Sequence, residues 1–168
     1  MSKTKNLVLT ALSIAIVFVA TSVIRVPLAP DGGLVHLGSV ALFALSVVFG
    51  KWTGAIAGSA GMAMFNLTTE WAVWAPFTFV IRFVMGYIIG YITHMGGSDG
   101  GSMRLNLLAV IVSGLWFLPA SYVAGAIILS NWAIPVTHIP GNAIQVALML
   151  VLGVPLANLL NRHKKHIM

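Results

Sequence analysis

The sequence predicts an all-α membrane protein: a single domain of six transmembrane helices over residues 1–168, with both chain ends in the cytoplasm. Hydrophobic residues make up 59% of the 168 residues, and the mean hydropathy is +1.00. Charged residues make up only 7%, whereas a soluble domain has about 25%. The apolar residues fall into six runs, most of them close to the roughly 20 residues that cross a bilayer as a helix. These observations exclude a water-soluble globular protein.

The first three predicted helices cover residues 7–24, 34–49 and 52–69. Lys5 precedes the first apolar run, and Arg25 and Pro27 end it. A loop rich in proline and glycine leads into the second run, and Gly50 and Lys51 separate the second run from the third. The second run is short for a full crossing, which is typical of a helix that tilts little or lies beside a cavity.

The last three predicted helices cover residues 76–94, 105–130 and 139–160. Pro76 suits a first helical turn, and a flexible glycine-rich loop at residues 96–101 follows the fourth helix. Pro119 predicts a kink inside the fifth helix, because proline lacks the backbone N–H that a helix interior needs. Pro155 lies near the end of the sixth helix.

The basic residues predict the orientation, because Lys and Arg collect in short cytoplasmic loops. With six helices, both ends lie on the same side as the second and fourth connections. That side holds Lys3, Lys5, Lys51, Arg104, Arg162, Lys164 and Lys165, against Arg25 alone on the other. Both termini are therefore expected in the cytoplasm, and the net charge of +6 reflects topology rather than binding of nucleic acid. The outer face then carries the connections at residues 25–33, 70–75 and 131–138.

Several kinds of chemistry are excluded by missing residues. The chain has no cysteine, which excludes disulfides and thiolate sites, and it has no P-loop for ATP. Its three carboxylates, Asp31, Glu70 and Asp99, form no cluster that could hold magnesium. We therefore expect no enzyme activity, no cofactor and no metal.

Arg82 is the most informative single residue. It lies about six residues from the outer end of the fourth helix, roughly 9 Å at 1.5 Å per residue, in a run with no other charge. An arginine inside a span costs about 2.5 to 3.5 kcal/mol and marks a functional site by default. Two compatible explanations stay open: Arg82 forms an ion pair with Glu70 that locks the third and fourth helices, or it lines a cavity and binds a ligand.

Other polar and aromatic residues of the outer face are candidates for the same cavity. Asn142 and Gln145 are three residues apart and share a helix face that approaches His138. Their alternative role is hydrogen bonding between helices. Trp71, Trp74 and Trp132 are either interfacial belt residues, the usual role, or stack on a flat ligand. We expect a flat, polar, near-neutral ligand in the outer third of the bundle, bound by Asp31, His36, Glu70, Trp71, Arg82, Trp132, His138, Asn142 and Gln145.

Small residues at helical spacing predict close helix contacts. Gly54, Gly58 and Gly61 share a face of the third helix, and Gly86 and Gly90 share a face of the fourth. Ala11 and Ala15 have the same spacing on the first helix. For these alanines spacing alone favours an internal contact over a partner surface.

The chain resembles the substrate-binding S components of energy-coupling factor (ECF) vitamin transporters. The resemblance lies in Ala11-x-x-x-Ala15, the first loop running into Val35-His36-Leu37-Gly38, and Phe49-Gly50-Lys51-x-x-Gly54-Ala55-x-x-Gly58. Within that group it is most similar to members assigned to hydroxymethylpyrimidine or pyridoxine.

The resemblance implies a subunit of a prokaryotic plasma membrane that captures a vitamin at the outer face. It implies two partners, a transmembrane coupling protein and a pair of cytoplasmic ATPases. It also implies that Ala11 and Ala15 form the docking surface and that residues 26–33 gate the site. Two other classes stay open: a self-sufficient channel or facilitator, and a small membrane enzyme.

Overall fold

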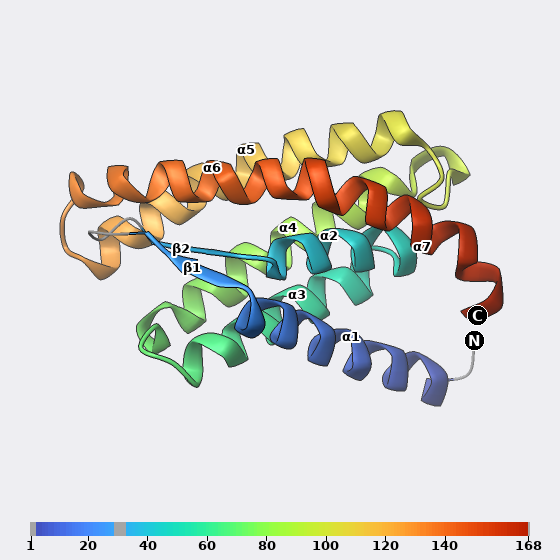
Figure 1. The fold of residues 1–168 in the computed structure, drawn as a ribbon, viewed down its shortest axis with the longest axis horizontal. Coiled ribbons are helices and arrows are strands. Elements are labelled where there is room, and N and C mark those ends of the chain that lie inside the picture. Colours follow the sequence, from blue (N-terminus) through green and yellow to red (C-terminus); the bar gives the residue numbers. More distant parts are fainter. Residues whose placement is uncertain (1–2, 29–32, 168) are drawn as a thin grey trace.

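The computed structural model describes residues 3–28 and 33–167 as a bundle of helices with a short β-hairpin (Figure 1). The helices are α1 (Lys3–Val23), α2 (Gly38–Phe49), α3 (Lys51–Leu67), α4 (Ala75–Thr93), α5 (Met103–Ile128), α6 (Ile139–Leu148) and α7 (Val154–Ile167). A π-helical segment, Met149–Gly153, joins α6 to α7. Short 3₁₀ turns occupy Ala72–Trp74, Met95–Gly97 and Ile134–His138.

Four helical segments are long and apolar enough to cross a membrane. They are Lys3–Val23, Ala72–Thr93, Met103–Ile128 and Ile134–His163. The other two helices are shorter, with 12 residues in α2 and 17 in α3. At 1.5 Å per residue α2 covers only about 18 Å, so the count of six full crossings stays a prediction.

The expected second helix is wrong at its start, and the fold is not entirely helical. Residues Leu34–His36 form strand β2, which pairs antiparallel with β1 (Arg25–Pro27) in the register Arg25 to His36. The N–H of Leu37 then donates to the carbonyl of Ile24 at 3.2 Å. This pairing extends up to Leu37, so α2 begins at Gly38 rather than at residue 34. The β-branched residues Val26 and Val35 face each other in this pair, which suits their preference for extended backbone.

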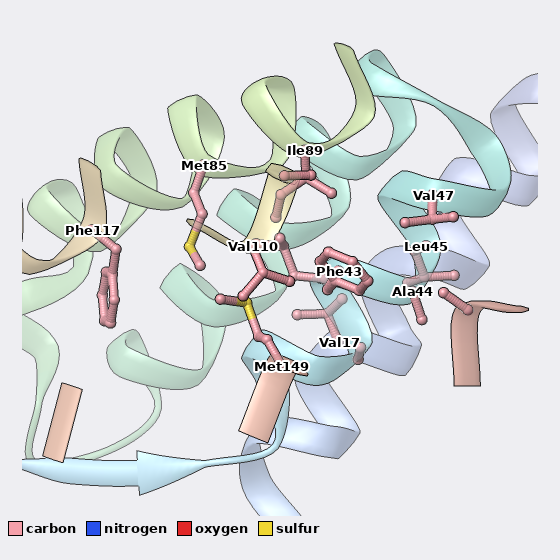
Figure 2. Close-up of a cluster of buried hydrophobic side chains, with 14 of the residues drawn as sticks. Val17, Phe43, Ala44, Leu45, Val47, Met85, Ile89, Val110, Phe117 and Met149 are labelled. Carbon is pink, nitrogen blue, oxygen red and sulfur yellow. The ribbon is translucent and has the colours of Figure 1, made fainter. Parts of the chain in front are cut away.

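Helix α2 forms the centre of the bundle, with every residue from Gly38 to Val48 buried. Its apolar side chains point in all directions, which is typical of a helix enclosed by other helices. Figure 2 shows Phe43 and Leu45 of α2 in the core with Val17 of α1, Met85 of α4 and Met149 of the π-helical segment. The short second run in the sequence is therefore a helix buried in protein.

Glycines allow α3 and α4 to touch through their backbones. A Cβ added at Gly86 would lie 2.7 Å from the carbonyl oxygen of Gly54, and one added at Gly90 would lie 2.3 Å from the backbone nitrogen of Lys51. Any side chain at these positions would force the helices apart. The expected internal packing of the glycine stripes is confirmed here.

Pro119 and Pro155 act differently from each other. Helix α5 continues as one α-helix through Pro119. Pro155 is the second residue of α7, just after the π-helical segment, and a π segment is one way in which a helix absorbs a local disruption of its hydrogen bonds.

The connections lie at two opposite ends of the bundle (Figure 1). The start of α1, the end of α7, the corner between α2 and α3 and the loop between α4 and α5 lie at one end. The hairpin β1–β2, the turn between α3 and α4 and the connection between α5 and α6 lie at the other, here called the hairpin end. This arrangement agrees with an even number of passes, and which end faces the cytoplasm stays a prediction.

Candidate functional site

A cavity of about 90 Å³ lies between the hairpin and the helices α3, α4, α5 and α6. Its lining comes from five parts of the chain: Gly33, Leu34 and His36 of the hairpin; Asn66 of α3 with Trp71 and Trp74 after it; Thr78, Ile81 and Arg82 of α4; Phe117 and Ser121 of α5; His138, Asn142 and Gln145 of α6 and the turn before it. The lining mixes aromatic rings with hydrogen-bonding groups, which is typical of a site for a small organic ligand.

Arg82 is the centre of the polar lining and is only 5% exposed. One terminal nitrogen, Nη1, donates to Ser39 Oγ at 3.0 Å and to the sulfur of Met85 at 3.3 Å. The other, Nη2, donates to Gln145 Oε1 at 3.1 Å. The guanidinium also lies 4.0 Å from the ring centroid of Phe117, a cation–π distance. Arg82 therefore joins α4 to α2, α5 and α6.

Gln145 connects this network to the hairpin. Its Oε1 accepts from Arg82 and, at 2.8 Å, from Ser39 Oγ, while its Nε2 donates to the carbonyl of Leu34 at 3.0 Å. The orientation of the amide is thus fixed by its partners on both sides. The side chain of Gln145 therefore links Arg82 directly to strand β2.

His36 is a neutral imidazole at the base of the hairpin. It is 9% exposed, and its Nδ1 is buried with no hydrogen-bond partner among the described residues. Burial, and second the charge of Arg82, lower the pKa of His36 to about 3. The ring therefore remains uncharged at neutral pH and offers hydrogen bonding without adding to the charge of the site.

Six of the predicted site residues line the cavity together: His36, Trp71, Arg82, His138, Asn142 and Gln145. Two other predicted residues that the structure describes do not line it. Glu70 is exposed, with its carboxylate accepting from Trp71 Nε1 at 3.1 Å, and Trp132 is 63% exposed with its ring 6.1 Å from that of Tyr122. Asp31 lies outside the described residues, as does part of the predicted gate at 26–33.

The possible ion pair between Glu70 and Arg82 does not form. Among the described residues, the partners of Arg82 are neutral groups on α2, α4, α5 and α6. Within the described residues, the ion pair found is that of His94 with Asp99 at 3.2 Å, in the loop after α4. Proximity in sequence to Glu70 was therefore a poor guide, because Arg82 points into the bundle and Glu70 points out of it.

Some lining residues carry no sequence signal that marks them as such. Phe117 and Ser121 read as ordinary bundle residues. Ser39 is not part of the lining, but it also carried no signal that it would accept a hydrogen bond from Arg82. Asn66 is visible as a polar residue in a span; its Nδ2 donates to Thr78 Oγ1 at 2.7 Å. Trp74 was expected either in the interfacial belt or against a ligand; its ring lies 5.7 Å from that of His138 and it lines the cavity.

Ala11 and Ala15 lie on the outside of the bundle. Both are exposed, while Ser13, Val17 and Thr21 form the buried face of α1. The internal contact that spacing favoured is therefore wrong, and the small-residue stripe faces outward.

Comparison with known proteins identifies the family. The family model described as "ECF-type riboflavin transporter, S component" matches residues 1–162. A protein of Pyrococcus woesei described as "Uncharacterized protein in gap 3'region" is 27% identical over 107 residues, which cover 64% of this chain and 72% of the relative. Together with the apolar helices, the match over nearly the whole chain shows that this multi-pass membrane protein belongs to the family of S components of ECF-type riboflavin transporters.

Proposed function

We propose that the protein is the vitamin-binding S component of an ECF-type importer and that the cavity at the hairpin end is its vitamin site. The observation that supports this most is the convergence of His36, Arg82, Asn142 and Gln145 on one cavity. These residues come from three separate parts of the chain. Burying polar groups in a membrane protein is costly, and such groups therefore mark a functional site by default.

The size of the cavity favours a small ligand. About 90 Å³ is less than the roughly 150 Å³ of an engineered cavity that takes up benzene. A single-ring vitamin or precursor, such as hydroxymethylpyrimidine or pyridoxine, requires a modest widening, whereas the three-ring system of riboflavin requires a large one. Riboflavin remains the second candidate because the family description names it.

The exposed stripe of Ala11 and Ala15 supports dependence on partners. Small residues let another helix approach closely within a membrane. We propose that this face docks on a transmembrane coupling protein that works with two cytoplasmic ATPases. The sequence itself has no P-loop, and partners that hydrolyse ATP would supply the energy for transport against a gradient.

The direct test is ligand binding by the purified protein in detergent. Calorimetric titration with hydroxymethylpyrimidine, pyridoxine and riboflavin should give saturable binding of at least one single-ring compound. Asn142→Ala and His138→Ala should each weaken that binding about 5- to 100-fold, because each removes a hydrogen-bonding group from the lining without leaving a charge unpaired.

The matched controls are Asn6→Ala and His163→Ala, which change exposed residues near the ends of the chain and should leave binding unchanged. If neither lining variant weakens binding more than its control, the cavity is not the ligand site. If riboflavin alone binds, the single-ring proposal fails and the family description gives the substrate.

A further inference from the structure

Arg82 provides the only permanent charge on the described lining of the cavity. The side chain is 5% exposed, and the described lining residues include no Asp or Glu. The two histidines of the lining, His36 and His138, supply no negative charge in either protonation state. The described cavity wall therefore has a net positive charge.

The partners of Arg82 leave part of its guanidinium free to bind. Hydrogen bonds run from Nη1 to Ser39 and Met85 and from Nη2 to Gln145. Arginine has five N–H donors in a planar fork, so two donors, on Nε and Nη2, have no partner among the described residues. The edge of a guanidinium formed by Nε and Nη2 is one that a carboxylate can bind with both oxygens.

Neutral partners only partly offset the cost of burying a cation. A buried charge normally pairs with an opposite charge, and hydroxyl, amide and thioether groups carry none. In a membrane protein a buried charge is more costly still, and it marks a functional site by default. A charge left in this state inside a cavity indicates that the ligand supplies the missing negative charge.

We propose that the ligand is a single-ring carboxylate whose anionic group binds Arg82. This inference rests on the proposed function, because it assigns the ligand of the same cavity. The ring lies against Phe117 and Trp74, and Asn142 and Ser121 hydrogen-bond its other polar groups. One arginine matches one negative charge, so a carboxylate fits better than a phosphate ester with nearly two.

The experiment compares ligands that differ in this one group. Hydroxymethylpyrimidine is titrated against the corresponding pyrimidine-5-carboxylate, and pyridoxine against its 4-carboxylate, with the two phosphate esters as further probes. The carboxylate of at least one pair should bind 10- to 100-fold more tightly than the alcohol, the gain expected for charged hydrogen bonds. The phosphate esters should bind more weakly than the carboxylate.

Variants test whether Arg82 causes the preference for the carboxylate over the alcohol. Arg82→Gln should abolish the preference for the carboxylate while changing the affinity for the alcohol much less, and Arg82→Lys should retain part of it. The matched control Arg25→Gln changes an exposed arginine at the same end of the bundle and should retain all of it. Asp31→Asn should also retain it.

Each outcome has a distinct meaning. Tighter binding of the alcohols by the wild-type protein overturns the inference and leaves the proposed function intact. A carboxylate preference that appears only in Asp31→Asn also overturns it, because Asp31 would then neutralise Arg82. The comparison in the wild-type protein does not depend on whether Arg82→Gln folds. Binding of none of these compounds overturns both proposals, and binding of riboflavin alone overturns this one.

Discussion

At the scale of single residues, the charge and the hydrogen-bonding capacity of the site depend on which partners each polar side chain has. Gln145 uses both ends of its amide, accepting from Arg82 and Ser39 and donating to Leu34. His36 has its Nδ1 without a partner and sits where a proton would add a second positive charge near Arg82. The two residues therefore keep the site at a single positive charge while leaving hydrogen-bonding capacity.

The low pKa of His36 predicts that acid destabilises the fold. The pKa is about 3 in the folded protein and about 6.5 in an unfolded chain, so the unfolded state takes up the proton first. Stability contributed by neutral His36 is present above about pH 6.5 and falls as the pH decreases toward 3, by about 2 kcal/mol at pH 5. Thermal unfolding in detergent should therefore show a smaller loss between pH 7 and pH 5 in His36→Gln than in the wild type.

The control for that measurement is His163→Gln, which changes an exposed histidine near the end of α7. It should show the same pH dependence as the wild type. An identical pH dependence in His36→Gln would mean that the pKa of His36 is the same in the folded and the unfolded protein.

At the scale of elements, burial separates two helices that look alike in composition. Helix α2 is buried on every side, whereas α1 buries only Ser13, Val17 and Thr21 and leaves most of its surface for other contacts. In a bilayer both are apolar, because lipid and protein interior have similar polarity. Composition therefore predicts the membrane but not which helix lies inside the bundle.

The exposed face of α1 predicts a separation of binding from transport. Ala15→Trp places a large ring on the small-residue stripe, which should block a partner helix and reduce vitamin uptake by whole cells at least tenfold. Ligand affinity of the isolated subunit should change less than twofold, because the cavity lies at the hairpin end. The matched control is Ile16→Trp, which is also exposed but lies about 100° around the helix and should leave uptake intact. Equal uptake by both variants would exclude this face as the docking surface.

At the scale of the whole molecule, helix positions follow from the apolar runs, while the hairpin does not. The first, third, fourth and fifth runs match helices within a few residues. The sixth run corresponds to α6, the π-helical segment and α7, and the helix continues past its expected end. The second run fails at its start because Leu34–His36 is apolar enough for either helix or strand, and pairing with Arg25–Pro27 decides between them. Short apolar runs are ambiguous in this way.

The site was predictable where polar residues stand out against apolar surroundings, as Arg82, Asn142 and Gln145 do. It was not predictable where the role depends on direction. Trp74 and Trp132 are the same residue type, and both lie in connections between helices. Trp74 nevertheless lines the cavity, whereas Trp132 is exposed. Ser39 resembles any helix serine until α2 is known to face Arg82.

The orientation of the whole bundle leads to the last prediction. Seven of the Lys and Arg residues lie at or near the end of the bundle opposite the hairpin, so that end should face the cytoplasm. The chain has no cysteine, so Ser98→Cys and Asp31→Cys each introduce a single target for a membrane-impermeant maleimide. In intact cells Asp31→Cys should be labelled and Ser98→Cys should react only after the membrane is opened. The reverse result would place the cavity on the cytoplasmic side, where it could not capture a vitamin from outside.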